Sequence, residues 1–286
     1  MALVHWPSLR IPTAICQLLR HTELVRKFAV LVQRTRRTAR LRLPMEAAQI
    51  IRNAISAVLV MREDAARDSE LKTALDQVKQ FQSLRFAHTY SDLSQDERYR
   101  HAVAFFLTDL YSEAPYDERD AQFFRVAGVL QRLLPKSALL AAVALAQLHQ
   151  ISEQLDLQMA KVWMIPKPGK LDRVERYCMA WNQVAQRVQR ERQLQLVVEI
   201  GAKLDHLTKR PGLRLLLTAM RGPASAIKLG ALQHFLERGF DSFQALGRSG
   251  GGAKVFLEII LARESALMSA LFDANLAEFR LQVGNI

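Results

Sequence analysis

Residues 137–163 read SALLAAVALAQLHQISEQLDLQMAKVW, and the apolar side chains of this stretch return at the spacing of an α-helix. Steps of three or four residues separate the members of one apolar stripe: Leu140, Ala144, Leu148, Ile151, Leu155 and Met159. Such steps place side chains on one face of a helix, whereas a strand needs alternation with a period of two. The stretch is rich in Ala, Leu and Gln, which are good helix formers. The sequence therefore predicts one long amphipathic helix here.

The same helical period continues on both sides of this stretch. No segment alternates with a period of two over the length of a strand, and no Asn-Gly or Asp-Gly hairpin turn occurs. Prolines and glycines are few and lie between the periodic segments, where they break helices. We therefore predict an all-α protein, a multi-helix bundle of about ten helices. The helices are expected at roughly residues 13–42, 45–63, 68–90, 95–111, 117–134, 137–163, 171–208, 213–221, 224–238 and 252–281. Within these, Ser94 and Glu97 have the spacing of a capping box that would begin the helix at 95–111.

The cluster Pro166-Lys167-Pro168-Gly169 is the clearest internal boundary. Proline and glycine together favour a turn or a linker. We predict three parts: a basic N-terminal helical arm at residues 1–62, a motif-bearing helical subdomain at 63–165 and a C-terminal helical subdomain at 170–286. Alternatively, the cluster only turns the chain within one bundle. The sequence leaves both arrangements open.

The positive charge of the chain is concentrated in the arm. The net charge is +12, and residues 1–62 hold eleven Arg and Lys against two acids. The first interpretation is a solvated, Arg-rich helix face. The alternative is attachment to nucleic acid or to an anionic membrane surface through residues 10–62, because a basic segment attracts phosphates. We expect the arm to be dispensable for folding. Met45 and Met61 offer alternative starts, so the sequence leaves open whether residues 1–60 are translated as part of the native protein.

The cysteines and the apolar runs favour a cytoplasmic location. Cys16 and Cys178 are far apart and match no metal or redox spacing, so a disulfide framework is not expected. The richest apolar run, Leu139 to Ala146, is far shorter than the roughly 20 residues that span a bilayer. Arg10 and Pro12 interrupt the N-terminal stretch, which does not read as a secretory signal.

Residues 105–111 read FFLTDLY, and other short strings accompany them, such as TYSDL at 89–93, LQHFLERGF at 232–240 and Arg263-Glu264. From about residue 65 onward the chain resembles the bacterial FFLEELY-motif proteins, with Thr108 and Asp109 in place of the two motif glutamates. The resemblance covers about three quarters of the chain and implies an uncharacterised family. It implies no activity, ligand or active site.

The sequence offers no recognisable catalytic or metal-binding pattern. No two of the seven histidines are three or four residues apart, and no Asp or Glu has a His three residues later, as a di-iron bundle would need. No Gly-x-Ser-x-Gly elbow occurs. We therefore predict no catalytic residue, no metal and no cofactor, and keep a zinc or haem site built from distant histidines as the less favoured alternative. Glu153 and Asp156 share a helix face and are interpreted as surface charge, and the glycines at 250–252 as a helix–helix turn.

Polar residues around the motif are the best candidates for a binding site. They are Arg85, Asp92, Arg98, Asp109, Tyr111, Arg119 and Asp120. Because an unpaired carboxylate beside Phe105 and Phe106 would be costly, we expect Asp109 to form a buried pair with Arg119 across the turn at Pro115. The favoured interpretation is a hydrogen-bonded network that locks the helices together. A small-ligand or partner site built on it is the alternative.

These observations leave three hypotheses for function. The first is a protein that acts by binding another protein, with no catalytic role. The second is a helical enzyme or small-ligand binder that uses a pocket between the motif helices. The third is attachment to nucleic acid or a membrane surface through the arm. The identity of the partner and the oligomeric state lie beyond the sequence.

Overall fold

The structure, a computed structural model, describes residues 44–110, 117–165, 171–248 and 252–284. Every regular element in these ranges is helical, which confirms the all-α prediction. The expected helix at 13–42 and Tyr111 lie outside them. The elements are α3 (Pro44–Ala66), α4 (Ser69–Thr89), α5 (Ser91–Gln95), α6 (Arg100–Phe105), the π-helical turn η2 (Phe106–Leu110), α7 (Asp117–Leu133), α8 (Lys136–Met164), α9 (Arg173–Val184), α10 (Arg187–Thr208), α11 (Leu213–Ala219), α12 (Arg221–Ala226), α13 (Gly230–Arg248), α14 (Gly252–Phe272) and α15 (Leu276–Val283).

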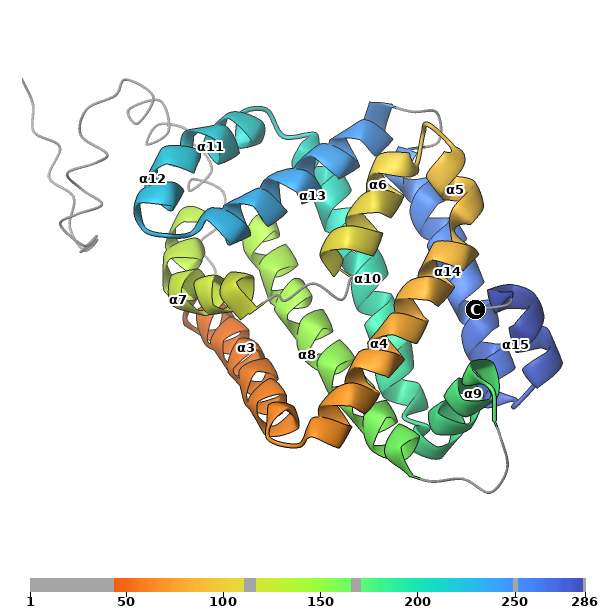
Figure 1. The fold of residues 1–286 in the computed structure, drawn as a ribbon. Helices are drawn as coiled ribbons and strands as arrows, with labels where there is room; N and C mark the ends of the chain where they lie inside the picture. The colour runs from red at the N-terminus through yellow and green to blue at the C-terminus, as the bar shows by residue number, and fades with distance from the viewer. Residues whose placement is uncertain (1–43, 111–116, 166–170, 249–251, 285–286) are drawn as a thin grey trace, which may run out of the picture.

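Helix α8 is the central element of the bundle. It contacts α3 on one side and α10, α4 and α9 on others, and it runs through the middle of the molecule in Figure 1. Ala144, Leu148, Leu155 and Met159 of the predicted stripe are buried, as expected for a helix surrounded by others. Leu140, the first member of the stripe, is instead exposed, whereas its neighbours Leu139 and Ala141 are buried. The long helix predicted at 137–163 is therefore confirmed.

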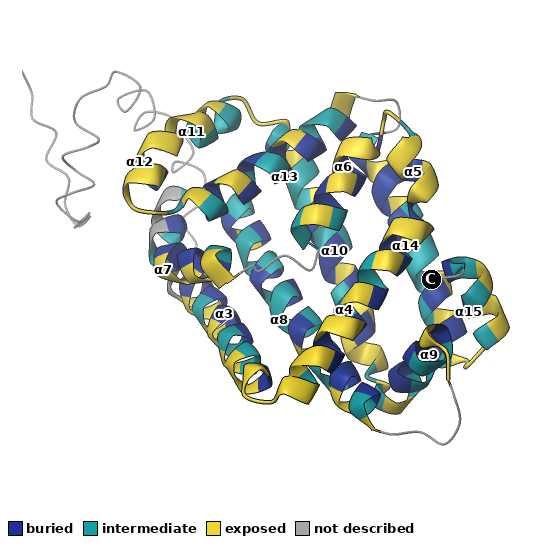
Figure 2. Ribbon diagram, viewed as in Figure 1, coloured by how far each residue is buried: buried dark blue, intermediate teal, exposed yellow. Residues whose placement is uncertain are grey.

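Three clusters of buried apolar side chains form the core. Figure 2 shows the buried residues along the inward faces of the helices. The first cluster joins α4, α5 and α6 to α8, α10, α13 and α14. The second joins α4 and α8 to α9, α14 and α15, and the third joins α3, α6, α7 and α8 to α13. Each cluster contains residues that precede positions 166–170 and residues that follow them. The parts of the chain on the two sides of these positions therefore share one core.

Helix α3 changes the interpretation of the N-terminal arm. Ile51, Ile55 and Val58 on this helix have no exposed surface, and α3 packs along α7 and α8. Fully burying such a side chain contributes roughly 1.5–3 kcal/mol. Residues 44–62 are thus part of the core, and the expectation that the whole arm is dispensable is wrong for them. Residues 1–43 lie outside the described part of the chain.

The helix expected at 171–208 is two helices. Ala185 and Gln186 between α9 and α10 have φ angles of 55° and 58°, in the left-handed region that ends a helix. The apolar period runs on across this break, which is why the sequence did not predict it. Val188, which continues the stripe in the sequence, is 75% exposed because the break turns it outward.

The helix expected at 95–111 is also interrupted. Helix α5 ends at Gln95, α6 begins at Arg100, and the motif continues into the π-helical turn η2. The Ser94 hydroxyl donates to the carbonyl of Ser91, so the predicted capping box is wrong. The helices expected at 224–238 and 252–281 also have different limits. Helix α12 ends at Ala226 and α13 begins at Gly230. Helix α14 ends at Phe272 and α15 begins at Leu276. None of the described helices is long and apolar enough to cross a membrane.

Candidate functional site

A cavity of about 120 Å³ lies between the motif helix and the helices around it. Its walls come from α6, η2, α7, α8, α10, α11 and α13. Every lining residue is Phe, Leu, Ile, Val, Ala or Gly, and the two motif phenylalanines, Phe105 and Phe106, are among them. We call this space the apolar cavity. A cavity with such walls offers no hydrogen-bond partner to water, so it favours an apolar occupant.

Small residues on α8 create this space. Ala138, Ala141 and Ala142 line the cavity from that helix, where larger side chains would fill it. On the opposite wall, Gly239 of α13 lets the ring of Phe105 approach closely, because a Cβ there would lie 3.0 Å from Cζ of Phe105. The cavity therefore results from side-chain size at particular helical positions.

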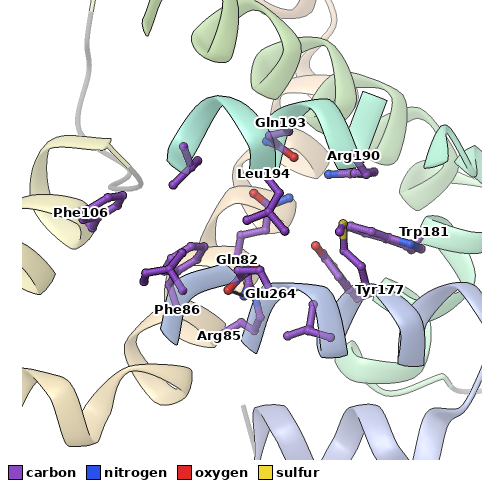
Figure 3. A pocket seen from close by; sticks show the side chains of 14 residues that line it. Gln82, Arg85, Phe86, Phe106, Tyr177, Trp181, Arg190, Gln193, Leu194 and Glu264 are labelled. Atoms are coloured by element: carbon purple, nitrogen blue, oxygen red, sulfur yellow. Dashed lines mark hydrogen bonds and ion pairs between the residues drawn. The ribbon is translucent and has the colours of Figure 1, made fainter. Parts of the chain in front are cut away.

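A second cavity, of about 50 Å³, adjoins the first and is polar. Phe106 and Val197 line both cavities. Figure 3 shows the side chains that surround the smaller space: they come from α4, α9, α10 and α14, with Phe106 at one side. We call it the chamber. Its polar lining residues are Gln82, Arg85, Tyr177, Trp181, Arg190, Gln193 and Glu264.

The pair Arg85–Glu264 holds one side of the chamber. Nη1 of Arg85 donates to Oε1 of Glu264 at 2.7 Å, and the hydroxyl of Tyr90 donates to the same oxygen at 2.8 Å. Arg85 is buried. Burial alone would lower the pKa of Arg85, but the charge of Glu264 outweighs it and raises that pKa above its usual value. Arg85 therefore stays charged inside the protein.

Asp156 contacts Gln82, one of the residues that line the chamber. It is 7% exposed, and Nε2 of Gln82 donates to its Oδ1 at 2.9 Å. Burial, with a contribution from the nearby charge of Glu153, raises the pKa of Asp156. Glu153 is only 4% exposed, so the interpretation of these two carboxylates as surface charge is wrong. Burial would raise the pKa of Glu153 as well, but Lys79 at 2.7 Å and Arg62 at 3.2 Å lower it.

The raised pKa of Asp156 gives a testable pH dependence. The folded protein retains a proton on this carboxyl at pH values where the unfolded chain, with a pKa of 3.8, has lost it. Its contribution to stability is therefore greatest at low pH and is lost as the pH rises through the raised pKa. Asp156→Asn keeps an acceptor for Gln82 and cannot ionise. We expect this variant to gain stability relative to the parent protein as the pH rises from about 4 to 8, measured by urea unfolding.

The matched control for this measurement is Asp76→Asn. Asp76 is exposed, so this variant shows what the same replacement does at the surface of the protein. The pKa of Asp120 is lowered, so the stability that Asp120 contributes is lost as the pH falls. Asp120 is present in both proteins, and this effect cancels in the difference between them. If the difference in stability between Asp156→Asn and the parent protein did not change with pH, the pKa of Asp156 would not be raised in the folded protein.

A further buried network ties α3, α7 and α8 together. Arg62 of α3 contacts Asp117 at 2.8 Å, Asp120 at 3.0 Å and Glu153 at 3.2 Å. His149 of α8 lies 2.6 Å from Asp120 through its Nε2 atom. Burial opposes the charge of Asp120, but His149 and the arginines outweigh it and lower its pKa. Most of these charges are satisfied by one another, which is typical of a structural network.

The seven predicted site residues do not form one site. Arg85 lies in the chamber, and Asp120 lies in the network of Arg62. Asp92 pairs with Arg263 at 2.7 Å, and Arg98 pairs with Asp96 at 2.6 Å, both on exposed surface. Tyr111 lies outside the described residues.

The expected buried pair of the Asp109 carboxylate with Arg119 is wrong. The carboxylate of Asp109 lies 3.0 Å from Arg238 of α13 and accepts from the hydroxyl of Thr108 at 2.7 Å. Arg119 donates to the main-chain carbonyl of Asp109 at 2.9 Å and contacts Asp120 at 3.3 Å. The motif segment therefore contacts α7 through the main-chain carbonyl of Asp109, and it contacts α13 through the carboxylate of Asp109.

The sequence assigned no site role to five polar residues that the fold buries or half-buries. Glu153, Tyr177 and Arg190 are buried, and His149 and Glu264 are half-buried. Glu264 carried a signal, since Arg263-Glu264 is one of the strings shared with the resembled family. The others lie on helices without any distinctive spacing. In the ranges that the structure covers, no three His, Cys, Asp or Glu side chains are grouped to hold a metal.

These features define an all-α protein with an apolar cavity between its helices and a polar chamber beside it. A family model described as "Domain of unknown function (DUF8198)" matches residues 61–278, and the chain belongs to this family. The comparisons with curated proteins and with solved structures give no match. This match confirms the prediction that the chain belongs to an uncharacterised family from about residue 65 onward. The more specific resemblance to bacterial FFLEELY-motif proteins stays a prediction.

Proposed function

We propose that this protein binds a small apolar molecule in the apolar cavity. The observation that carries the proposal is a cavity of about 120 Å³ with only hydrophobic or glycine residues in its walls. An unfilled cavity costs about 24 cal/mol for each Å³, or on the order of 3 kcal/mol for this volume. A suitable ligand recovers the lost contacts. This is the second of the three hypotheses, without a catalytic step.

The size of the cavity defines the ligand. An engineered apolar cavity of about 150 Å³ lined by similar residues binds benzene. The apolar cavity, at about 120 Å³, therefore suits an aromatic ring or an alkyl chain of roughly six carbons. Its six phenylalanines, on α6, η2, α7 and α13, would surround such a group with ring faces and edges.

Helix α11 offers a route of entry. Leu213 and Leu217 on this helix line the cavity, yet the helix has no buried residue. It begins after Gly212, whose φ of 85° is in the left-handed region. A short, weakly buried helix opens at lower cost than a core helix. The wall formed by α11 is thus the most easily displaced side of the cavity.

The exposed apolar residues give less support to a protein-binding surface. Val188, Leu215 and Leu281 are each at least 70% exposed, but they lie on α10, α11 and α15. Single exposed apolar residues of this kind are normal on soluble proteins. Binding of a protein partner, attachment through residues 10–62 and a cytoplasmic location stay predictions.

The test fills the cavity. We expect benzene to raise the melting temperature of the full chain, because a ligand at 100 times its dissociation constant adds about 2.7 kcal/mol of stability. Ala141→Leu places a larger side chain in the cavity. This variant should keep its helical circular dichroism, become as stable or about 0.5–2 kcal/mol more stable, and lose the response to benzene.

Gln154→Leu is the matched control, since Gln154 is an exposed residue of the same helix outside the cavity. It should respond to benzene as the parent protein does. Cyclohexane and toluene extend the test to other shapes. An equal response of Ala141→Leu and the parent protein would mean that the probe binds elsewhere, and no response of the parent protein to any of these probes would refute the proposal.

A further inference from the structure

A further cavity, of about 50 Å³, adjoins the apolar cavity. Its walls come from α3, η2, α7, α8 and α13. Six of its apolar residues also line the apolar cavity: Leu110, Phe123, Leu145, Leu148, Leu232 and Phe235. Four polar side chains complete the walls: Arg119, Asp120, His149 and Ser152. We call this space the histidine pocket. It is a polar extension of the apolar cavity.

Helix α8 forms a wall of both spaces. Leu145 and Leu148 line the two of them, and His149 and Ser152 continue the same helix into the histidine pocket. Since a helix rises 1.5 Å per residue, His149 lies about 6 Å along the helix axis from Leu145. His149 and Ser152 are three residues apart, so they share a face of the helix. A small molecule whose apolar part lies beside Leu145 therefore reaches both polar side chains.

Asp120 fixes the position of the proton on His149. Nε2 of His149 lies 2.6 Å from Oδ2 of Asp120. Asp120 also contacts Arg62 and Arg119, so it is ionised, and a carboxylate only accepts hydrogen bonds. Nε2 therefore carries the proton and donates it, and its 3.5 Å contact with Nη2 of Arg62 is too long to compete. In the neutral imidazole Nδ1 is then an acceptor, and it makes no hydrogen bond within the described residues.

The hydroxyl of Ser152 offers the complementary hydrogen bond. Its Oγ accepts from Nε2 of Gln193 at 2.7 Å, which leaves the hydroxyl proton for another acceptor. None of the residues that the structure describes accepts that proton. An occupant beside His149 and Ser152 therefore meets one acceptor and one donor. A hydroxyl group satisfies both, whereas a carbonyl or an ether oxygen only accepts.

The charged side chains of the histidine pocket favour a neutral occupant. Arg119 and Asp120 both line it and contact each other at 3.3 Å. Asp120 is buried and contacts Arg62 and His149 as well. Asp120 would repel an anion, and Arg119 would repel a cation. The volume of about 50 Å³ accommodates a hydroxyl group, since a water molecule needs about 10–15 Å³ of such space.

We propose that the histidine pocket binds the hydroxyl group of a small neutral alcohol whose hydrocarbon part lies in the apolar cavity. The hydroxyl donates to Nδ1 of His149 and accepts from Oγ of Ser152. This inference rests on the proposed function, because the apolar cavity holds the rest of the molecule. It narrows the ligand to an alcohol with a hydrocarbon part of roughly six carbons.

Three ligands with the same six-carbon ring test the inference by calorimetry on the full chain at pH 8, which favours neutral imidazole. Cyclohexanol donates and accepts, cyclohexanone only accepts, and cyclohexane reports on the apolar cavity alone. We expect cyclohexanol to bind about five- to tenfold more tightly than cyclohexanone, because the ketone leaves Nδ1 of His149 without a donor.

Two variants locate the hydroxyl group. His149→Gln keeps a donor for Asp120 and removes the acceptor at Nδ1, so it should reduce the preference for cyclohexanol over cyclohexanone to within about twofold. Cyclohexane binding should not change. Ser152→Ala should weaken both oxygen-bearing ligands about fivefold, since each accepts from this hydroxyl, and it provides a second test should His149→Gln fail to fold. His101→Gln, at an exposed position of α6 outside the three cavities, is the control and should change nothing.

The outcomes separate the two proposals. Equal binding of cyclohexanol and cyclohexanone, with cyclohexane still bound, overturns the inference and leaves the proposed function intact. A preference for cyclohexanol that His149→Gln leaves unchanged also overturns the inference. Cyclohexanol binding that His149→Gln weakens and Ala141→Leu does not, without any cyclohexane binding, supports recognition of the hydroxyl by His149 and overturns the proposed function. Absence of binding by all three ligands overturns both.

Discussion

Glu264→Leu should lower the free energy of unfolding by about 3–5 kcal/mol, measured by urea unfolding at pH 7. The substitution removes the carboxylate that accepts from Arg85 at 2.7 Å and from Tyr90 at 2.8 Å. Arg85 is buried and remains charged, because an arginine does not lose its proton in a protein. A charge left in the core without its partner costs far more than the pair itself contributed.

A double substitution separates this explanation from simple loss of packing. Arg85→Met in the same chain removes the stranded charge, so the double variant should recover a substantial part of the loss. Asp76→Asn is the control, because the pair of Lys72 and Asp76 is exposed at 53% and 58% of the two side chains. Exposed pairs of this kind contribute about 0–1 kcal/mol. A loss below about 1 kcal/mol for Glu264→Leu would mean that solvent reaches Arg85.

The periodicity of the sequence was sufficient to predict the helices, because burial of one face is a local property. The stripe on α8 is an example: Ala144, Leu148 and Leu155 are buried against neighbouring helices as their spacing required. The breaks were harder to predict. Ala185 and Gln186 adopt left-handed backbone, although neither residue type favours it, and the apolar period continues past them.

The polar residues show the limit of sequence reasoning most clearly. Glu153 and Asp156 have the spacing of an ordinary charged helix face. They are buried because Lys79 and Gln82 of α4 and Arg62 of α3, more than 70 residues away, reach them. Contacts at such separation depend on how the helices assemble, and the sequence of α8 alone does not encode them.

The same reason explains the wrong pairing of Asp109. Arg119 was the nearest base across a short turn, so it was the natural local partner. In the fold, Arg238 of α13 lies beside the motif helix and takes the carboxylate. The apolar cavity could not be predicted from the sequence for a related reason. Its volume exists only after several helices have packed around the alanines of α8.

Phe105→Ala should also cost about 3–5 kcal/mol, which is the usual range for removing a buried phenylalanine ring. Phe105 is 3% exposed, and its ring centroid lies 5.5 Å from that of Phe235 and 6.3 Å from that of Phe106. Its ring also packs closely against Gly239, which has no side chain that could move into the vacated space. The surroundings therefore relax only in part, and a larger void remains.

This loss should be partly reversible by a ligand, which distinguishes Phe105 from other core residues. Because Phe105 lines the apolar cavity, its removal enlarges a space that already exists. Naphthalene, too large for the parent cavity, should raise the melting temperature of Phe105→Ala more than that of the parent protein. Phe81→Ala is the matched control: Phe81 is fully buried but does not line the cavity, so its loss should show no such recovery.

Phe124→Ala, at a 38% exposed position of α7, should cost less than about 1 kcal/mol. Equal losses for Phe105→Ala and Phe124→Ala would show that the motif ring is not part of a packed wall, and the case for an apolar ligand between the motif helices would fall with it.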